Sequence, residues 1–213
     1  SLFIIVNAEA SNHTLIHSGE TCTPESGTYV VLTNEQLEEL SNCTTLDGNL
    51  FIHGGLELTD IDLLPLSNLR VINGYLVIWN SQNIHCLMGL YNLDNILGNN
   101  LYLDQYALYV KDNFRDSHIH NGNETRDGLC YVDTVNWNTI LNNNNYLISD
   151  NGENCPSCHT ECDGCFSEGP RYCQNCAHYK SGDTCVDVCP TGTTIQNSTC
   201  LESEPSKPTD FNI

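Results

Sequence analysis

Cysteines dominate the chemistry that this sequence could carry. Five of them stand within 19 residues, from Cys158 to Cys176, and thiols at that density either bind zinc as thiolates or oxidise in pairs to disulfides. Two close pairs, at 162/165 and 173/176, could each begin a zinc knuckle, but only seven residues separate them. In a zinc site built from two such pairs, roughly 12 to 20 residues separate them. The cysteines that follow at 185, 189 and 200 are not grouped in fours, so the spacing favours disulfides.

The same block is too poor in apolar residues to fold around a core. Nine cysteines lie between Cys155 and Cys200, among turn-forming Gly, Pro, Asp and Ser. Each disulfide restricts the unfolded chain and contributes roughly 2–4 kcal/mol, so here the crosslinks take the place of a core. Nine is odd, and so is the total of 13. At least one cysteine of the block pairs outside it or stays reduced, and one thiol of the chain is left over.

The start of the chain predicts a secretory route, in which thiols pair. An apolar run at residues 2–6 precedes Ala8-Glu9-Ala10, the small-x-small pattern of a signal-peptidase site. We interpret residues 1–10 as a signal-peptide remnant; the alternative is a buried first strand. Four glycosylation sequons, at Asn12, Asn42, Asn123 and Asn197, agree with a secreted or extracellular protein.

Charge and motifs exclude several functions. The chain carries 27 Asp and Glu against 7 Lys and Arg, a formal charge of −20, which disfavours nucleic acid and anionic membranes as partners. The charge indicates either a solvated extracellular surface or steering of a basic protein ligand. His118 and His120 stand in a polar segment that we expect to be a loop without a companion acid, so we predict no metal site there. No catalytic constellation and no phosphate-binding loop is present, and we expect neither a cofactor nor an enzyme.

Residues 20–150 contain a repeat. Three stretches, at 42–48, 68–74 and 92–98, share the order Asn, Cys or Leu, two residues, Leu or Ile, one residue, Gly. An alternating strand follows each, so that Leu50 and Ile52 match Leu76 and Ile78, with residues 101 and 103 as the third pair. A period near 25 residues with a strand in each unit indicates a solenoid. We expect the asparagines to bond backbone at the bends and the glycines to allow tight corners with positive φ.

Solenoid ends need caps, and two helices are predicted there. Thr33 and Gln36 form a capping-box pattern ahead of Leu37 and Leu40. Asp133 is the expected N-cap of a second helix, in which Trp137 serves as a core anchor.

These segments resemble a known family. Residues 42–54, 68–80, 98–110 and 129–141 resemble the receptor L domain of the epidermal growth factor and insulin receptor families: NCTTLDGNLFIHG, NLRVINGYLVIWN, GNNLYLDQYALYV and LCYVDTVNWNTIL. CHTECDGCFSEGPRYCQNC and CVDVCP, at residues 158–176 and 185–190, resemble the furin-like cysteine-rich modules that follow it there. The implied fold is mostly β: a right-handed β-solenoid with short capping helices, then a small disulfide-rich furin-like rod.

The resemblance also implies a disulfide pairing that resolves the parity problem. Mapped onto this chain, the pairs are Cys22–Cys43, Cys130–Cys155, Cys158–Cys165, Cys162–Cys173, Cys176–Cys185 and Cys189–Cys200. Cys86 has no family partner, and we expect a buried thiol that forms no disulfide rather than a bridge to another chain. Phe166 stands where the family usually has Trp, and the implied role is that of an anchor packing back into the L domain.

The domains predicted in this way are an L domain at 20–155, cysteine-rich modules at 156–200, and at 201–213 an extended tail or the start of a further domain. The L domain looks one solenoid turn short, because a polar insert at residues 114–127 separates ALYVKDN from LCYVDTVNW.

The resemblance implies a non-catalytic extracellular module that binds a small protein ligand, growth-factor or insulin-like, or a receptor chain. It could act as a secreted decoy or as a piece of a receptor tyrosine kinase, and we expect no membrane insertion within this segment. The alternative is a secreted structural or adhesive glycoprotein. The sequence does not identify the ligand contacts, although Tyr75, Trp79 and Tyr102 are natural candidates.

Overall fold

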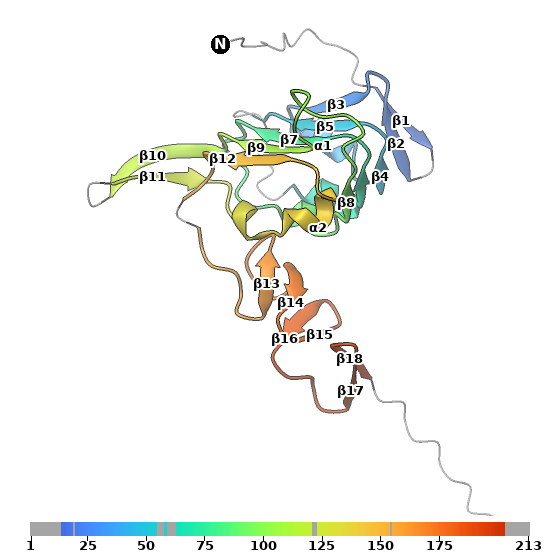
Figure 1. Ribbon diagram of the computed structural model, residues 1–213, viewed down its shortest axis with the longest axis vertical. Helices are drawn as coiled ribbons and strands as arrows, with labels where there is room; N and C mark the ends of the chain where they lie inside the picture. The colour runs from blue at the N-terminus through green and yellow to red at the C-terminus, as the bar shows by residue number, and fades with distance from the viewer. Residues whose placement is uncertain are drawn as a thin grey trace, which may run out of the picture.

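The computed structural model describes residues 14–18, 20–54, 58, 63–120, 123–153 and 155–202, with residues 115–120 and 123–126 described by their backbone. The proposed signal-peptide remnant, Asn12 and the tail beyond residue 202 lie outside these ranges. Figure 1 shows a β-rich body, a hairpin that projects from one side of it, and a cysteine-rich rod that runs away from the body near α2. The prediction of a mostly β fold is confirmed.

Two sheets, formed by alternate passes of the chain, make up the body. Sheet A has the strand order β1-β2-β4-β6-β8, and sheet B has the order β12-β9-β7-β5-β3. The strands of sheet A are β1 (Leu15–Ser18), β2 (Thr21–Pro24), β4 (Thr45–Leu46), β6 (Val71–Ile72) and β8 (Asn95–Ile96). Those of sheet B are β3 (Thr28–Val31), β5 (Asn49–Ile52), β7 (Leu76–Trp79), β9 (Leu108–Lys111) and β12 (Tyr146–Ser149).

Successive turns stack in register, as a solenoid requires. Leu46 pairs in parallel with Ile72, and Leu50 and Ile52 pair with Leu76 and Ile78, as the repeat predicted. These inward side chains are fully buried and belong to one continuous core cluster. Each turn therefore buries its apolar face against its neighbours rather than within itself.

The predicted strand of the third turn is wrong. Leu76 and Ile78 pair with Leu108 and Val110, not with residues 101 and 103. Leu103 is 59% exposed, whereas Leu108 is fully buried. Residues 99–106 instead form a loop between β8 and β9, and this insertion moves the strand further along the chain.

The repeated asparagines act as expected, by bonding the backbone of the turn before. Asn68 Nδ2 donates to the carbonyl oxygen of Ser41 (2.7 Å), and Asn92 Nδ2 donates to that of Ser67 (2.7 Å). Each amide thus satisfies a carbonyl at the bend and links two neighbouring turns.

The repeated glycines stack, but for a different reason from the one predicted. Gly74 N donates to Gly48 O (2.9 Å), and Gly98 N donates to Gly74 O (3.0 Å). Only Gly98 of the three has positive φ, at 65°. At Gly74 a Cβ would collide with the Asn49 side chain, so close approach between turns explains the need for glycine there.

The short helices cap the turns at both ends of the repeat. In α1 (Asn34–Glu38), Thr33 is the N-cap and forms the predicted capping box with Gln36. The second helix begins later than predicted: Asp133 lies inside the 3₁₀ helix η3 (Val132–Thr134), and the N-cap of α2 (Trp137–Leu141) is Asn136. Trp137 is a core residue, as expected, and its Nε1 donates to Val132 O (2.8 Å). Two further 3₁₀ helices are η1 (Leu64–Asn68) and η2 (Met88–Leu90).

The insert between β9 and η3 is a β-hairpin, not the expected loop. Its strands are β10 (Phe114–His120) and β11 (Asn123–Gly128), so His118 and His120 lie on a strand. The hairpin is a sheet of its own and projects from the body (Figure 1). β12 then returns to pair directly with β9.

Six disulfides join the pairs that the resemblance implies. Cys130–Cys155 connects the solenoid to the rod, and four bridges lie within the rod. The rod contains a two-stranded sheet, β13 (Cys162–Cys165) and β14 (Cys173–Cys176), and a four-stranded one of order β16-β15-β18-β17. Its strands are β15 (Tyr179–Ser181), β16 (Thr184–Val186), β17 (Thr193–Gln196) and β18 (Thr199–Glu202).

Phe166 ties the rod to the solenoid. Its side chain is 2% exposed and belongs to the solenoid's core cluster rather than to a core of the rod. On either side of it, Phe166 O accepts from Leu87 N (3.0 Å), and Thr134 Oγ1 donates to Cys165 O (2.7 Å). Cys86 is a buried thiol in a small cluster with Tyr131 and Cys165 at this junction, outside the six bridges.

Candidate functional site

One face of sheet B points away from the core and carries a continuous apolar row. Side chains alternate along a strand, so the neighbours of the inward Leu and Ile residues face outward. Phe51 and Val77 are buried, yet they are absent from the solenoid core cluster. The row, read from the strand register, is Val30, Phe51, Val77, Tyr109 and Leu147. We call this surface the outer face of sheet B.

Aromatic rings gather on this face around Tyr102. Its ring centroid lies 5.0 Å from that of Tyr109, 5.7 Å from Tyr75 and 5.9 Å from Phe51, and Tyr106 lies 5.9 Å from Tyr109. These five residues are called the aromatic cluster. Its edge and tilted geometries are those that aromatic pairs favour. Burial raises the pKa of both Tyr102 and Tyr109.

The loop of residues 99–106 builds the cluster by folding back on the sheet. Tyr102 N donates to Tyr106 O (2.8 Å) and Tyr106 N to Tyr102 O (3.0 Å), which closes the loop. At its tip Leu103 and Asp104 have φ values of 53° and 56°, in the left-handed region that most side chains avoid. The loop thus holds Leu103 out in solvent, 59% exposed, beside the aromatic cluster.

The carboxyl end of the same strands is polar. The rings of His53 and Trp79 stack, with centroids 4.8 Å apart and planes 17° apart. Trp79 Nε1 donates to Asp112 Oδ2 (3.2 Å). Lys111 Nζ lies 3.0 Å from Asp112 and 3.0 Å from Asp150, and its hydrogen bonds to Asp150 and Asp112 raise the pKa of Lys111. Two carboxylates against one ammonium leave this end negative.

Of the three residues named from the sequence as ligand-contact candidates, the structure brings two together. Tyr75 and Tyr102 lie in the aromatic cluster, while Trp79 lies with His53 at the polar end. Sequence reasoning missed Phe51, Tyr106 and Tyr109. The alternation of residues around Phe51 could have identified it as an outward-facing side chain. For Tyr106 and Tyr109, the wrong strand assignment in the third turn hid the corresponding pattern.

The predicted glycosylation sites fall in different parts of the described chain. Asn42, at the turn after α1, and Asn197, between β17 and β18, are both exposed. Asn123 is the first residue of β11. All three remain predictions.

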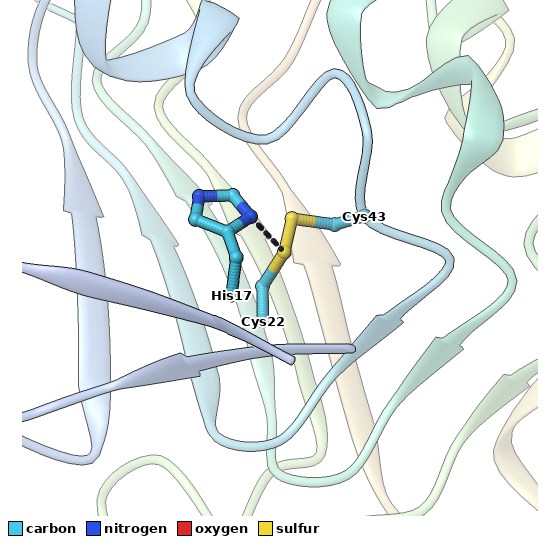
Figure 2. Close-up of side chains that lie close together, drawn as sticks. All are labelled: His17, Cys22 and Cys43. Atoms are coloured by element: carbon cyan, nitrogen blue, oxygen red, sulfur yellow. Dashed lines mark hydrogen bonds between the residues drawn. A yellow bond between two sulfur atoms is a disulfide. The ribbon is translucent and has the colours of Figure 1, made fainter. Parts of the chain in front are cut away.

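A histidine and a disulfide form a further chemical grouping. His17 Nδ1 lies 3.3 Å from Cys22 Sγ, and Cys22 is bonded to Cys43 (Figure 2). The three side chains have the composition of a Cys₂His zinc set, with their donor atoms within 4.8 Å of one another. Zinc binds thiolates, however, so the trio does not fit a metal while the bridge is closed.

Comparison with known proteins shows which families match this chain. The receptor L domain family matches residues 42–151, and growth factor receptor domain IV matches residues 123–208. The chain is 33% identical over 160 residues to mouse receptor tyrosine-protein kinase erbB-4, covering 62% of this chain and 12% of that protein. It is 28% identical over 172 residues to the Drosophila melanogaster epidermal growth factor receptor, covering 70% of this chain and 12% of that protein. It is 30% identical over 177 residues to the chicken epidermal growth factor receptor, covering 70% of this chain and 24% of that protein.

The chain therefore spans only 12–24% of the length of these relatives. Both matched families describe non-catalytic receptor modules, so the matched segment is not an enzyme. Within the described ranges, no helix combines the length and apolar character needed to span a membrane. With its repeat, its paired sheets and a match over more than half of its 213 residues, this chain belongs to the receptor L domain family.

Proposed function

We propose that the outer face of sheet B binds a small folded protein, either a growth-factor-like or insulin-like ligand or another receptor chain. The observation that carries this proposal is the aromatic cluster, with Tyr102 held over an apolar row by a strained loop. Aromatic side chains anchor protein interfaces because they bury a large area at a small entropic cost. Strain retained at a loop tip such as Leu103 is also characteristic of binding surfaces.

Charge suggests the character of the partner. Asp112 and Asp150 flank Lys111 at one end of the face, and the whole chain carries −20. A basic ligand would be attracted to this surface, and its association would slow as salt screens the attraction. The apolar row would then supply the contact area, and the acidic end would set orientation and on-rate.

The setting of this module is extracellular. Its six disulfides fit an oxidising compartment, and its relatives are named as receptors. We infer one of two biological forms: a secreted decoy that sequesters ligand, or the ligand-binding part of a receptor tyrosine kinase. Sequencing the full-length transcript tests the two forms, because a downstream apolar span and kinase would favour the receptor.

Capture from the extracellular medium of the source tissue tests the binding function. The glycosylated chain would be immobilised and its captured proteins identified by mass spectrometry, with Tyr109→Asp as the disrupting variant. Thr45→Asp places the same charge on sheet A and serves as the matched control. We expect a small cysteine-rich protein that the wild type and the control retain and the Tyr109 variant loses.

Other outcomes would count against this proposal. If a large matrix protein is captured instead, the chain is a structural or adhesive glycoprotein. If the small protein binds the Tyr109 variant as well as the wild type, the outer face of sheet B is not the binding surface.

A further inference from the structure

The Cys22–Cys43 bridge differs from the others in its neighbour. His17 on β1 pairs directly opposite Cys22 on β2, and this register places the imidazole against the sulfur (Figure 2). His17 is exposed, whereas both sulfur-bearing residues are fully buried. The His17 imidazole thus contacts both solvent and a sulfur of the buried disulfide.

Three sulfurs of the rod and its root lie against carbonyl oxygens, and a fourth, Cys165 Sγ, lies 3.8 Å from the hydroxyl of Thr134, which already donates to Cys165 O (2.7 Å). Cys155 Sγ lies 3.4 Å from Gly152 O, Cys162 Sγ 3.8 Å from Gly169 O, and Cys173 Sγ 3.4 Å from Pro170 O. A carbonyl oxygen cannot donate a hydrogen bond to a thiolate, whereas an imidazolium N–H can. The two kinds of bridge should therefore differ in how readily a thiolate departs.

We propose that Cys22–Cys43 is a thiol-exchange site, at which His17 assists the departure of Cys22. The thiolate of a small thiol attacks Cys43 Sγ, and a new disulfide forms between that thiol and Cys43. The Cys22–Cys43 bond breaks, and its electron pair leaves on Cys22 Sγ, which accepts a hydrogen bond from the His17 imidazolium. One disulfide is consumed and one is formed, so the step needs no other oxidant or reductant. His17 acts as a positioning residue, because the reacting bond is between sulfurs.

The local structure favours attack at Cys43 rather than at Cys22. Four residue pairs hold β1 on β2 and keep His17 against Cys22. Cys43 follows the short helix α1 and adjoins the exposed Asn42; its backbone N–H donates to Leu40 O (2.9 Å), and the next residue, Thr44, donates to Glu20 O (2.8 Å). Opening of this short segment exposes Cys43 while leaving the imidazole in place.

The charged groups on the surrounding elements are mostly carboxylates; the exception is Arg70, just before β6, whose backbone N–H donates to Thr44 O (2.8 Å) beside Cys43. Glu20 lies in the turn between β1 and β2 and accepts from Thr44 Oγ1 (3.4 Å), Glu39 ends α1, and Asp47 follows β4, where its backbone N–H donates to Cys22 O (2.8 Å).

Limited reduction of the intact chain tests this site. The protein would be exposed to substoichiometric dithiothreitol from pH 5 to 8.5, quenched with N-ethylmaleimide and mapped by mass spectrometry. We expect Cys22 and Cys43 to be labelled before the other ten bridged cysteines. Their rate constant, expressed per thiolate of the reagent, should rise as pH falls through the range in which histidines gain charge.

The variant His17→Asn should abolish that rise and slow the reaction at pH 5.5 by about three- to tenfold, because a better leaving thiolate departs faster. His85→Asn, at another exposed histidine, is the matched control and should leave the rate constant unchanged. If another bridge is reduced first, or if the rate constant does not vary with pH in the wild type, the proposal is wrong. An equal change at every pH in His17→Asn would also overturn it, because that result indicates loosening of the hairpin rather than assistance to the leaving sulfur.

Discussion

Phe166 connects the rod to the solenoid, and removing its ring should destabilise the domain that does not contain it. The side chain is 2% exposed and lies in the solenoid core. Truncating such a phenylalanine to alanine costs about 3–5 kcal/mol, from lost burial and the cavity left behind. With a urea m-value of about 2 kcal/mol/M, the unfolding midpoint of Phe166→Ala should fall by about 1.5–2.5 M.

Tryptophan fluorescence makes this experiment specific. The two tryptophans, Trp79 and Trp137, both lie in the solenoid part, so their signal reports its unfolding although the substitution is in the rod. Val188→Ala is the matched control, because Val188 belongs to the same rod and is 69% exposed. It should change the stability by less than about 0.5 kcal/mol. A shift below about 0.5 M for Phe166→Ala, or a solenoid transition that does not move, would refute the role of Phe166 as an anchor.

Two other predictions follow from buried polar groups. Asn113 is fully buried and bridges turns by accepting from Ser81 N (3.0 Å) and donating to Ile78 O (2.9 Å); Asn113→Ala strands these groups and should cost about 2–4 kcal/mol in urea unfolding. Burial raises the pKa of Tyr102, so its contribution to stability is fully present below the unfolded value of about 10 and is lost as pH rises through the folded value. Absorbance at 295 nm should therefore show several late-titrating phenols, since burial also raises the pKa of Tyr29, Tyr109 and Tyr131. Tyr102→Phe should reduce their number by one, and an unchanged late-titrating amplitude in that variant would contradict the assignment.

The stacking of the first two complete turns could be predicted from the sequence because the repeat and the strand coincide there. Leu50, Ile52, Leu76 and Ile78 follow their glycines at the same distance, and parallel stacking converts equal spacing into direct pairing. The first cap could also be predicted from the sequence, because Thr33 and Gln36 form a local hydrogen-bonded capping box. Both features depend on neighbours along the chain or on an exact repeat.

The third turn was misread because two segments offer the same alternation. Leu101 and Leu103 are apolar at alternate positions, as are Leu108 and Val110, and local pattern cannot choose between them. Tertiary structure decides: β9 is the segment that pairs with β7 on one side and β12 on the other. The segment that is not a strand, residues 99–106, forms the loop of the aromatic cluster. The wrong strand assignment therefore prevented the candidate site from being predicted from the sequence.

The hairpin is an insertion that leaves the outer face of sheet B intact. β10 and β11 pair antiparallel, and His120 lies opposite Asn123. From the sequence, this insert was expected to be a polar loop that leaves the L domain one solenoid turn short. Instead the hairpin forms its own sheet, and Tyr109 of β9 pairs directly with Leu147 of β12. The apolar row therefore crosses all five strands of sheet B without a break.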